Sequence, residues 1–62
     1  MKVKEIIQKA PQYEFIEIYD NENAIQFSGM NRYIDKSSDF LEKRVKNIWC
    51  EDYYCSLCIQ YE

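Results

Sequence analysis

Three cysteines near the C-terminal end of the chain are the residues best suited to metal or redox chemistry. Cys55 and Cys58 form a Cys-x2-Cys pair, and Cys50 lies five residues before it. Zinc takes about four ligands, usually Cys or His, and the 62-residue sequence contains no histidine. Glu51 or Asp52 would have to complete the set, and in a strand Cys55 and Cys58 point to opposite faces. We interpret the thiols as reduced packing residues, with a zinc or small-ligand site as an alternative.

The other routes to catalysis also lack their usual residues. No histidine is present to activate a serine, and the single glycine cannot build a phosphate-binding loop. A chain of 62 residues offers little concavity in which a carboxyl pKa could be raised towards neutral pH. The sequence therefore predicts a protein that is not an enzyme and needs no cofactor.

Cysteine usage and hydropathy indicate where such a chain would reside. An odd number of thiols does not suit a secreted disulfide framework, so a reducing compartment is favoured. No apolar run approaches the ~20 residues needed to cross a bilayer, and residues 1–10 lack the apolar stretch of a signal peptide. The expected location is the cytoplasm, with no membrane partner.

Charge is unevenly distributed along the chain. Residues 12–30 and 47–62 contain acidic side chains and no Lys or Arg, whereas residues 1–11 and 31–46 carry net positive charge. The net charge is −3, which argues against direct binding of nucleic acid. Acidic segments that also contain tyrosines suit contact with a basic protein. The candidate partner-binding residues are Glu14, Glu17, Tyr19, Asp20, Glu22, Glu51, Asp52, Tyr53 and Tyr54.

The elements that would position these residues follow from hydrophobic spacing. Val3, Ile6, Ile7 and Ala10 recur at helical intervals, and Pro11 ends the helix. Residues 13–19 and 24–28 alternate as strands around a turn at 20–23, which is rich in Asn and Asp. The expected inward side chains of this hairpin are Ile16, Ile18, Ile25 and Phe27.

The second half of the chain also ends in a predicted hairpin, although the sequence contains no internal repeat. Residues 30–39 have little pattern, with Met30, Tyr33 and Ile34 as candidate anchors, and Ser37 or Ser38 would cap a short helix running to Arg44. Residues 45–50 and 53–61 are predicted strands, the latter with Leu57, Ile59 and Tyr61 on one face. The predicted fold is a single α+β domain over residues 1–62, with the N-terminal helix packed on an antiparallel sheet of about four strands.

The sequence resembles a class of small accessory proteins in its composition and in its layout. It is rich in Ile, Lys, Asn and Tyr, and the layout is that of segments 2–7, 17–20, 25–29, 40–41 and 45–48. These proteins are encoded by bacteriophages and mobile elements of bacteria with AT-rich genomes, and they include acidic inhibitors of host defence such as anti-CRISPR proteins. The resemblance implies a role in the cytoplasm of a bacterial host, by occupation of a basic, nucleic-acid-binding surface of the target. It carries over no functional residue.

The sequence therefore predicts a non-catalytic, acidic protein-interaction module. Its carboxylates would pair with Lys or Arg of the partner, and its tyrosines would supply contact area. A small homodimer that uses the same aromatic face on itself is an alternative, because a chain of this length buries little of its surface alone.

Overall fold

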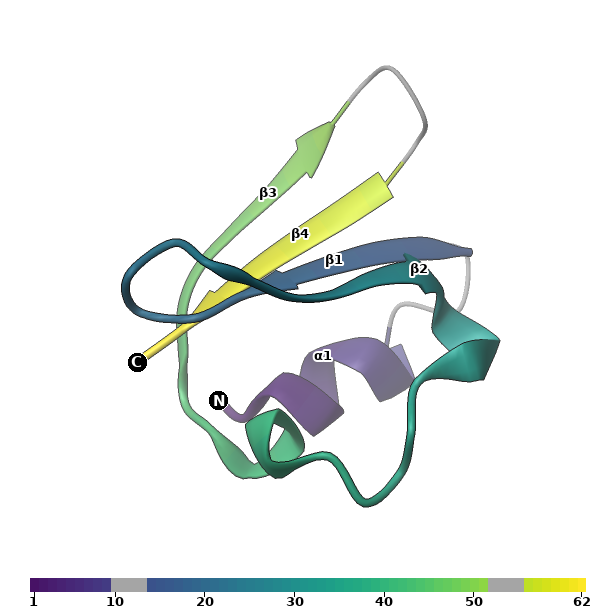
Figure 1. Cartoon of the computed structure of the whole chain (residues 1–62), viewed down its shortest axis with the longest axis horizontal. Helices are drawn as coiled ribbons and strands as arrows, with labels where there is room; N and C mark the ends of the chain where they lie inside the picture. The colour runs from purple at the N-terminus through teal and green to yellow at the C-terminus, as the bar shows by residue number, and fades with distance from the viewer. Residues whose placement is uncertain (10–13, 52–55) are drawn as a thin grey trace.

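The computed structural model describes residues 1–9, 14–51 and 56–62. A short helix, α1 (Val3–Lys9), is followed by strands β1 (Phe15–Tyr19) and β2 (Ile25–Met30). Two 3-10 turns, η1 (Asn31–Tyr33) and η2 (Asp39–Glu42), lead to strands β3 (Val45–Glu51) and β4 (Ser56–Tyr61). This order confirms the predicted α+β fold. All the described helical segments lie on one side of the sheet (Figure 1).

The four strands form one mixed sheet in the order β2-β1-β4-β3. Both hairpins are antiparallel, as predicted, but the central strands β1 and β4 run parallel. This pairing differs from the expected all-antiparallel sheet. Alternation fixes which face of a strand is buried but not the direction of its neighbour, and the long connection from β2 to β3 provides the crossover that a parallel pair needs.

The core lies between the sheet and α1. Ile16 and Ile18 of β1 pair with Leu57 and Ile59 of β4, and all four side chains are buried. Val3 of α1 is also fully buried. The two most apolar strands thus occupy the centre of the sheet, where both of their edges are hydrogen-bonded. A helix of seven residues is too short to be stable alone, so packing on this apolar face stabilises α1.

The turn between β1 and β2 is closed by the side chain of Asp20. Its Oδ1 accepts hydrogen bonds from the backbone N–H groups of Glu22 and Ala24, each at 2.9 Å. Asn23 adopts a left-handed conformation with φ of 68°, which asparagine tolerates better than most residues. The predicted Asn- and Asp-rich turn is confirmed. The Asp20 carboxylate accepts the hydrogen bonds that a backbone carbonyl would accept in an ordinary turn.

The prediction that Ile25 points into the core was wrong. A bulge follows the pair Ile18–Phe27, so Tyr19 pairs with Ile25 and Gln26 is the extra residue. The extra residue breaks the alternation that had placed Ile25 on the same face as Phe27. Ile25 is 56% exposed, whereas Phe27 packs against the core.

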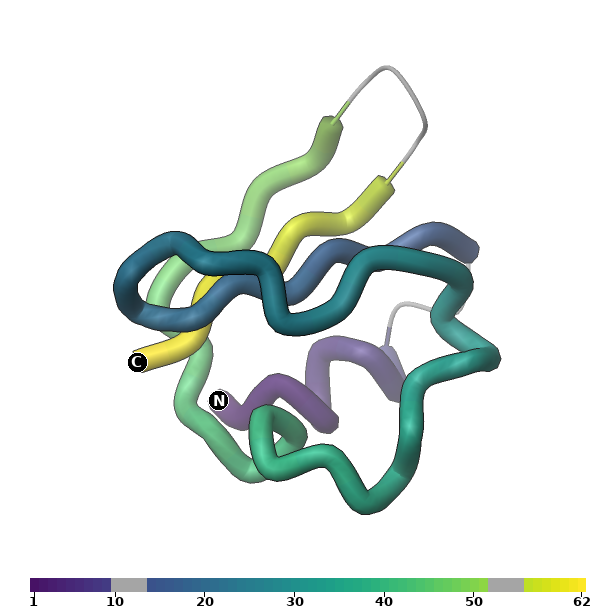
Figure 2. Tube along the Cα trace, viewed as in Figure 1, coloured from purple at the N-terminus to yellow at the C-terminus, as the bar shows by residue number. Residues whose placement is uncertain are grey.

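The connection from β2 to β3 runs beneath the sheet beside α1 (Figure 2). Ile34 anchors it to the core, as expected, whereas Tyr33 is 68% exposed. The expected short helix is the 3-10 turn η2, which ends at Glu42 and excludes Arg44. Ser38 occupies the N-cap position without a side-chain cap bond, and Ser37 instead donates its hydroxyl to Asp35 Oδ1 at 2.7 Å.

Candidate protein-binding face

One face of the sheet points away from α1, and we call it the open face. Its side chains alternate with those of the core, so Glu17 and Tyr19 of β1 lie on it. Strand register then places Glu17, Cys58 and Trp49 in one row across β1, β4 and β3. Tyr19, Gln60 and Asn47 form the next row. No described helix or turn covers this face (Figure 1).

An aromatic pair spans the middle of the open face. The rings of Tyr19 on β1 and Trp49 on β3 stack across β4, with centroids 5.5 Å apart and an interplanar angle of 30°. Both side chains are half-buried, so part of each ring meets solvent. Such offset stacking restricts the rotamers of both rings. Less side-chain entropy would therefore be lost if another molecule bound them.

A carboxylate lies beside the aromatic pair. Glu17 Oε2 accepts a hydrogen bond from the Tyr19 hydroxyl at 3.4 Å, and Glu17 Oε1 accepts one from the Cys58 thiol at 3.6 Å. Burial, followed by the nearby Glu17 charge, raises the pKa of Cys58 to about 12. The same two causes raise the pKa of Tyr19 above its ordinary value. Both donors therefore stay protonated at neutral pH and orient the Glu17 carboxylate.

A second carboxylate, that of Glu51, lies next to Trp49. The Trp49 indole Nε1 donates a hydrogen bond to Glu51 Oε1 at 3.3 Å. Asn47 and Gln60, in the neighbouring row, are joined by an amide–amide bond of 2.8 Å. In the part of the chain that the structure describes, both ion pairs involve Glu42 on the opposite side of the molecule. Glu17 and Glu51 are therefore not neutralised by a described cation.

The nine residues predicted to bind a partner lie in several places. Glu17, Tyr19 and Glu51 come together on the open face. Glu14 is exposed but borders the helix side of the sheet, and Glu22 is exposed at the tip of the β1–β2 turn. Asp20 is half-buried, and its carboxylate is used to close that turn. Asp52, Tyr53 and Tyr54 lie outside the described residues.

Sequence reasoning missed Trp49, the second ring of the stacked pair on the open face. Residues 45–50 were predicted to form a strand, and Trp49 lies two residues before Glu51, on the same face. The two-residue spacing from Glu51 could have indicated that Trp49 shares its face. The stacking of Trp49 on Tyr19, however, depends on β1 and β3 lying on either side of β4. Cys58, Gln60 and Asn47 were missed for the same reason.

The described cysteines do not converge. Trp49 pairs with Cys58 and Cys50 with Leu57, so Cys50 lies on the core side of the sheet and Cys58 on the open face. Cys58 is fully buried and Cys50 is exposed. Cys55 lies outside the described residues. In the described ranges, no three Cys, Asp or Glu side chains are grouped as a metal ion would require.

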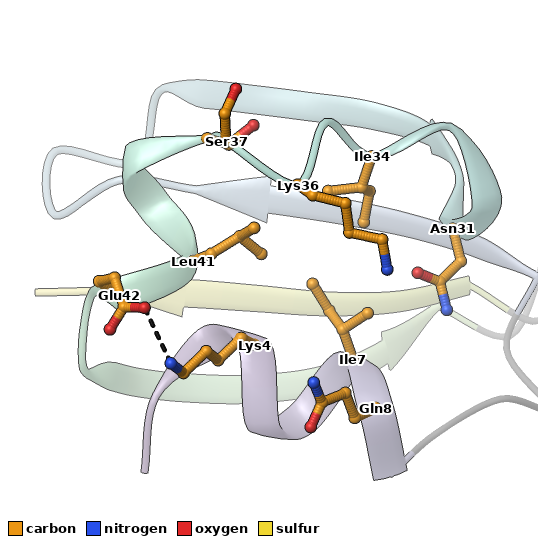
Figure 3. A pocket seen from close by; sticks show the side chains of 10 residues that line it. Lys4, Ile7, Gln8, Asn31, Ile34, Lys36, Ser37, Leu41 and Glu42 are labelled. Atoms are coloured by element: carbon orange, nitrogen blue, oxygen red, sulfur yellow. Dashed lines mark hydrogen bonds and ion pairs between the residues drawn. The ribbon is translucent and has the colours of Figure 1, made fainter.

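A groove of about 320 Å³ lies on the opposite side of the molecule, between α1 and the β2–β3 connection (Figure 3). Ile7, Ile34 and Leu41 form its apolar part. At one end, Glu42 accepts hydrogen bonds from Lys2 at 2.9 Å and Lys4 at 2.8 Å. These bonds lower the pKa of Glu42 to about 2. The contact ties η2 to α1.

The sequence and the fold were compared with known proteins in three ways. No match was found among protein-family models, curated proteins or solved structures. No helix among the described residues has the length and apolar character needed to cross a bilayer.

Proposed function

We propose that this chain is a non-catalytic, acidic protein-interaction module that binds a basic protein surface through its open face. One observation carries the proposal: each ring of the stacked Tyr19–Trp49 pair is hydrogen-bonded to a carboxylate, Glu17 or Glu51, and neither carboxylate is paired with a described cation.

This combination suits arginine and lysine side chains. A guanidinium group placed over Tyr or Trp gains a cation–π attraction of ~0.5–2 kcal/mol, depending on how far it is desolvated. A neighbouring carboxylate can accept its N–H groups, and tryptophan, tyrosine and arginine are the residues that contribute most at protein interfaces. The net charge of −3 would also speed encounter with a positively charged partner.

The partner class that we favour is a nucleic-acid-binding protein of a bacterial host, such as a CRISPR-type defence protein. Surfaces that bind nucleic acid are rich in Lys and Arg, and an acidic module can occupy them. The resemblance of the sequence to acidic accessory proteins of bacteriophages supports this assignment. In such a complex, the module would compete with nucleic acid for the same basic side chains.

A non-catalytic role is supported by the state of the polar groups near the groove. The Ser37 hydroxyl donates to Asp35, and backbone and side-chain hydrogen bonds from Ser37 hold the pKa of Asp35 below its usual value. A carboxylate with a lowered pKa is a weak general base, and this contact is a turn rather than a nucleophile–base pair aimed at a cavity. Glu42 is likewise an acceptor in two ion pairs.

The proposal can be tested with the single tryptophan as the reporter. Trp49 lies on the open face, so its fluorescence should change in a saturable way on titration with a short arginine-rich peptide. Binding should weaken as salt rises. Glu17→Gln should weaken it by roughly three- to tenfold, because one carboxylate charge contributes on the order of 1 kcal/mol at such a contact.

Glu5→Gln is the matched control, because it removes the same charge from α1 on the opposite side of the molecule. The control should bind as the unaltered protein does, and far-UV circular dichroism should show that both variants are folded. Equal weakening by the two substitutions would show that binding follows net charge alone, and the absence of saturable binding would refute the proposed face.

A further inference from the structure

The groove between α1 and the β2–β3 connection continues into a second hollow. The groove has a volume of about 320 Å³ and the adjoining hollow one of about 370 Å³. They share four lining residues, which are Ile7, Gln8, Asn31 and Lys36. The two hollows therefore form one continuous depression. Its volume lies in the lower part of the range found for small-molecule sites in proteins.

The floor of the groove is apolar. Ile7 of α1 faces Ile34 and Leu41 of the connection across it. Ile34 is only 7% exposed, whereas Ile7 and Leu41 are half-buried and keep part of their apolar surface in contact with water. An apolar group placed on this floor would remove that surface from water, which favours binding.

Three polar side chains surround the same floor. Figure 3 shows the Lys36 side chain extending into the groove on the side of Asn31, with Gln8 projecting from α1 on the other wall. Within the described ranges, none of these three side chains makes a hydrogen bond or an ion pair. The ammonium group offers three donors and each amide offers two more, so the groove has donors free for a ligand.

The charges of the depression favour an anion. Lys4, Lys36 and Glu42 line the groove, and Lys4 is already paired with Glu42 at 2.8 Å. The Lys36 ammonium group is left without a counter-ion. The adjoining hollow is lined by Lys36, Arg32 and Glu14, which again leaves one positive charge. A chain with a net charge of −3 thus carries a groove that is complementary to a single negative charge.

We propose that this groove binds a small monocarboxylate with an apolar chain, of the kind represented by medium-chain fatty acids. The ligand carboxylate pairs with the Lys36 ammonium group and accepts a hydrogen bond from the Asn31 amide. The apolar chain lies on Ile7, Ile34 and Leu41. A second carboxylate on the ligand would find no uncompensated cation in the groove.

The bound ligand would touch α1 and the connection together. Binding would therefore stabilise the packing of the short helix, because a ligand that binds only the folded state raises its stability by mass action. The groove lies on the helix side of the sheet, so this inference does not depend on the proposed function of the open face (Figure 1).

NMR titration of the isotope-labelled protein with hexanoate tests the site. The backbone amide signals of Ile7, Asn31 and Leu41 should shift in a saturable way, with a dissociation constant on the order of 1 mM. 1-Hexanol keeps the chain but lacks the charge, and it should bind roughly fivefold more weakly. Propionate keeps the charge but lacks most of the chain, and it should bind more weakly as well.

Substitutions of Lys36 separate the charge from the apolar floor. Lys36→Gln should weaken hexanoate binding by roughly fivefold. Lys43→Gln is the matched control, because Lys43 is also exposed but lines neither hollow, and it should bind hexanoate as the unaltered protein does. Lys36→Glu should abolish hexanoate binding and permit binding of hexylammonium. Far-UV circular dichroism should show that all three variants are folded.

Several results would overturn the proposal without the use of any variant. These are the absence of a saturable shift, equal binding of hexanoate and 1-hexanol, and shifts confined to the open face. Equal weakening by Lys36→Gln and Lys43→Gln would also overturn it. A protein that binds hexanoate but no arginine-rich peptide would leave this inference intact and refute the proposed function, and the opposite result would do the reverse.

Discussion

The buried thiol of Cys58 makes a quantitative prediction about stability at alkaline pH. Its pKa is raised from 9.0 to about 12 because the side chain is buried and lies beside Glu17. Because the pKa of the thiol is higher in the folded state than in the unfolded state, the thiol stabilises the fold fully at pH values below its unfolded-state pKa. That stabilisation is lost as pH rises from about 9 to 12. The loss from this group is about 1 kcal/mol at pH 10 and approaches about 4 kcal/mol at pH 12.

Such a loss is large for a chain of this length, whose total stability is expected to be ~3–9 kcal/mol. Urea unfolding from pH 7 to 11, followed by Trp49 fluorescence under reducing conditions, would measure it. Cys58→Ala should lower stability at pH 7 by about 1–2 kcal/mol through lost packing, but it should remove the thiol contribution to the alkaline slope. Tyr19 and Tyr61 also have raised pKa values, and their contribution remains in both proteins.

Two further results would follow from the same geometry. Glu17→Gln should make the alkaline slope shallower, because the Glu17 charge is the second cause of the raised Cys58 pKa. Iodoacetamide should label the exposed Cys50 in the folded protein and Cys58 only on unfolding. Parallel alkaline slopes in the unaltered protein and Cys58→Ala, or rapid labelling of Cys58 in the folded state, would refute the reasoning.

The remaining predictions concern carboxylates used by the fold itself. Hydrogen bonds from Lys4 and Lys2 lower the pKa of Glu42 to about 2. Its contribution to stability is therefore complete above about pH 4.5 and is lost as the pH falls towards 2. Glu42→Gln should therefore flatten the pH dependence of stability in this range, and an NMR titration midpoint of the Glu42 carboxyl near 4.5 would contradict the two ion pairs. Asp20→Ala should cost about 1–2 kcal/mol in urea unfolding, because it leaves two backbone N–H groups of the turn without their acceptor, whereas Glu22→Ala at the exposed tip should cost less than about 0.5 kcal/mol. Equal costs for these last two substitutions would show that Asp20 does not hold the turn.

The sequence predicted the elements well because their signals are local. Helical spacing of Val3, Ile6 and Ile7 identified α1, and the alternation around Ile16 and Ile18 identified the buried face of β1. The turn at residues 20–23 was also predictable, because an aspartate side chain closes it through neighbouring backbone groups.

The errors occurred where the deciding contact is not local. Ile25 belongs to an alternating stretch, but one bulged residue shifts its register and exposes it. The parallel pairing of β1 and β4 joins residues about forty positions apart, so no local pattern reveals it.

The candidate site shows the same division. The sequence alone determined that the chain is acidic, rich in tyrosine and without histidine, and it placed Glu17, Tyr19 and Glu51 in acidic segments. Only the tertiary structure decided that Tyr19 stacks on Trp49, because the two residues meet across a third strand. Composition and periodicity are properties of neighbours along the chain, whereas the stacked pair on the open face is made by the order of strands in the sheet.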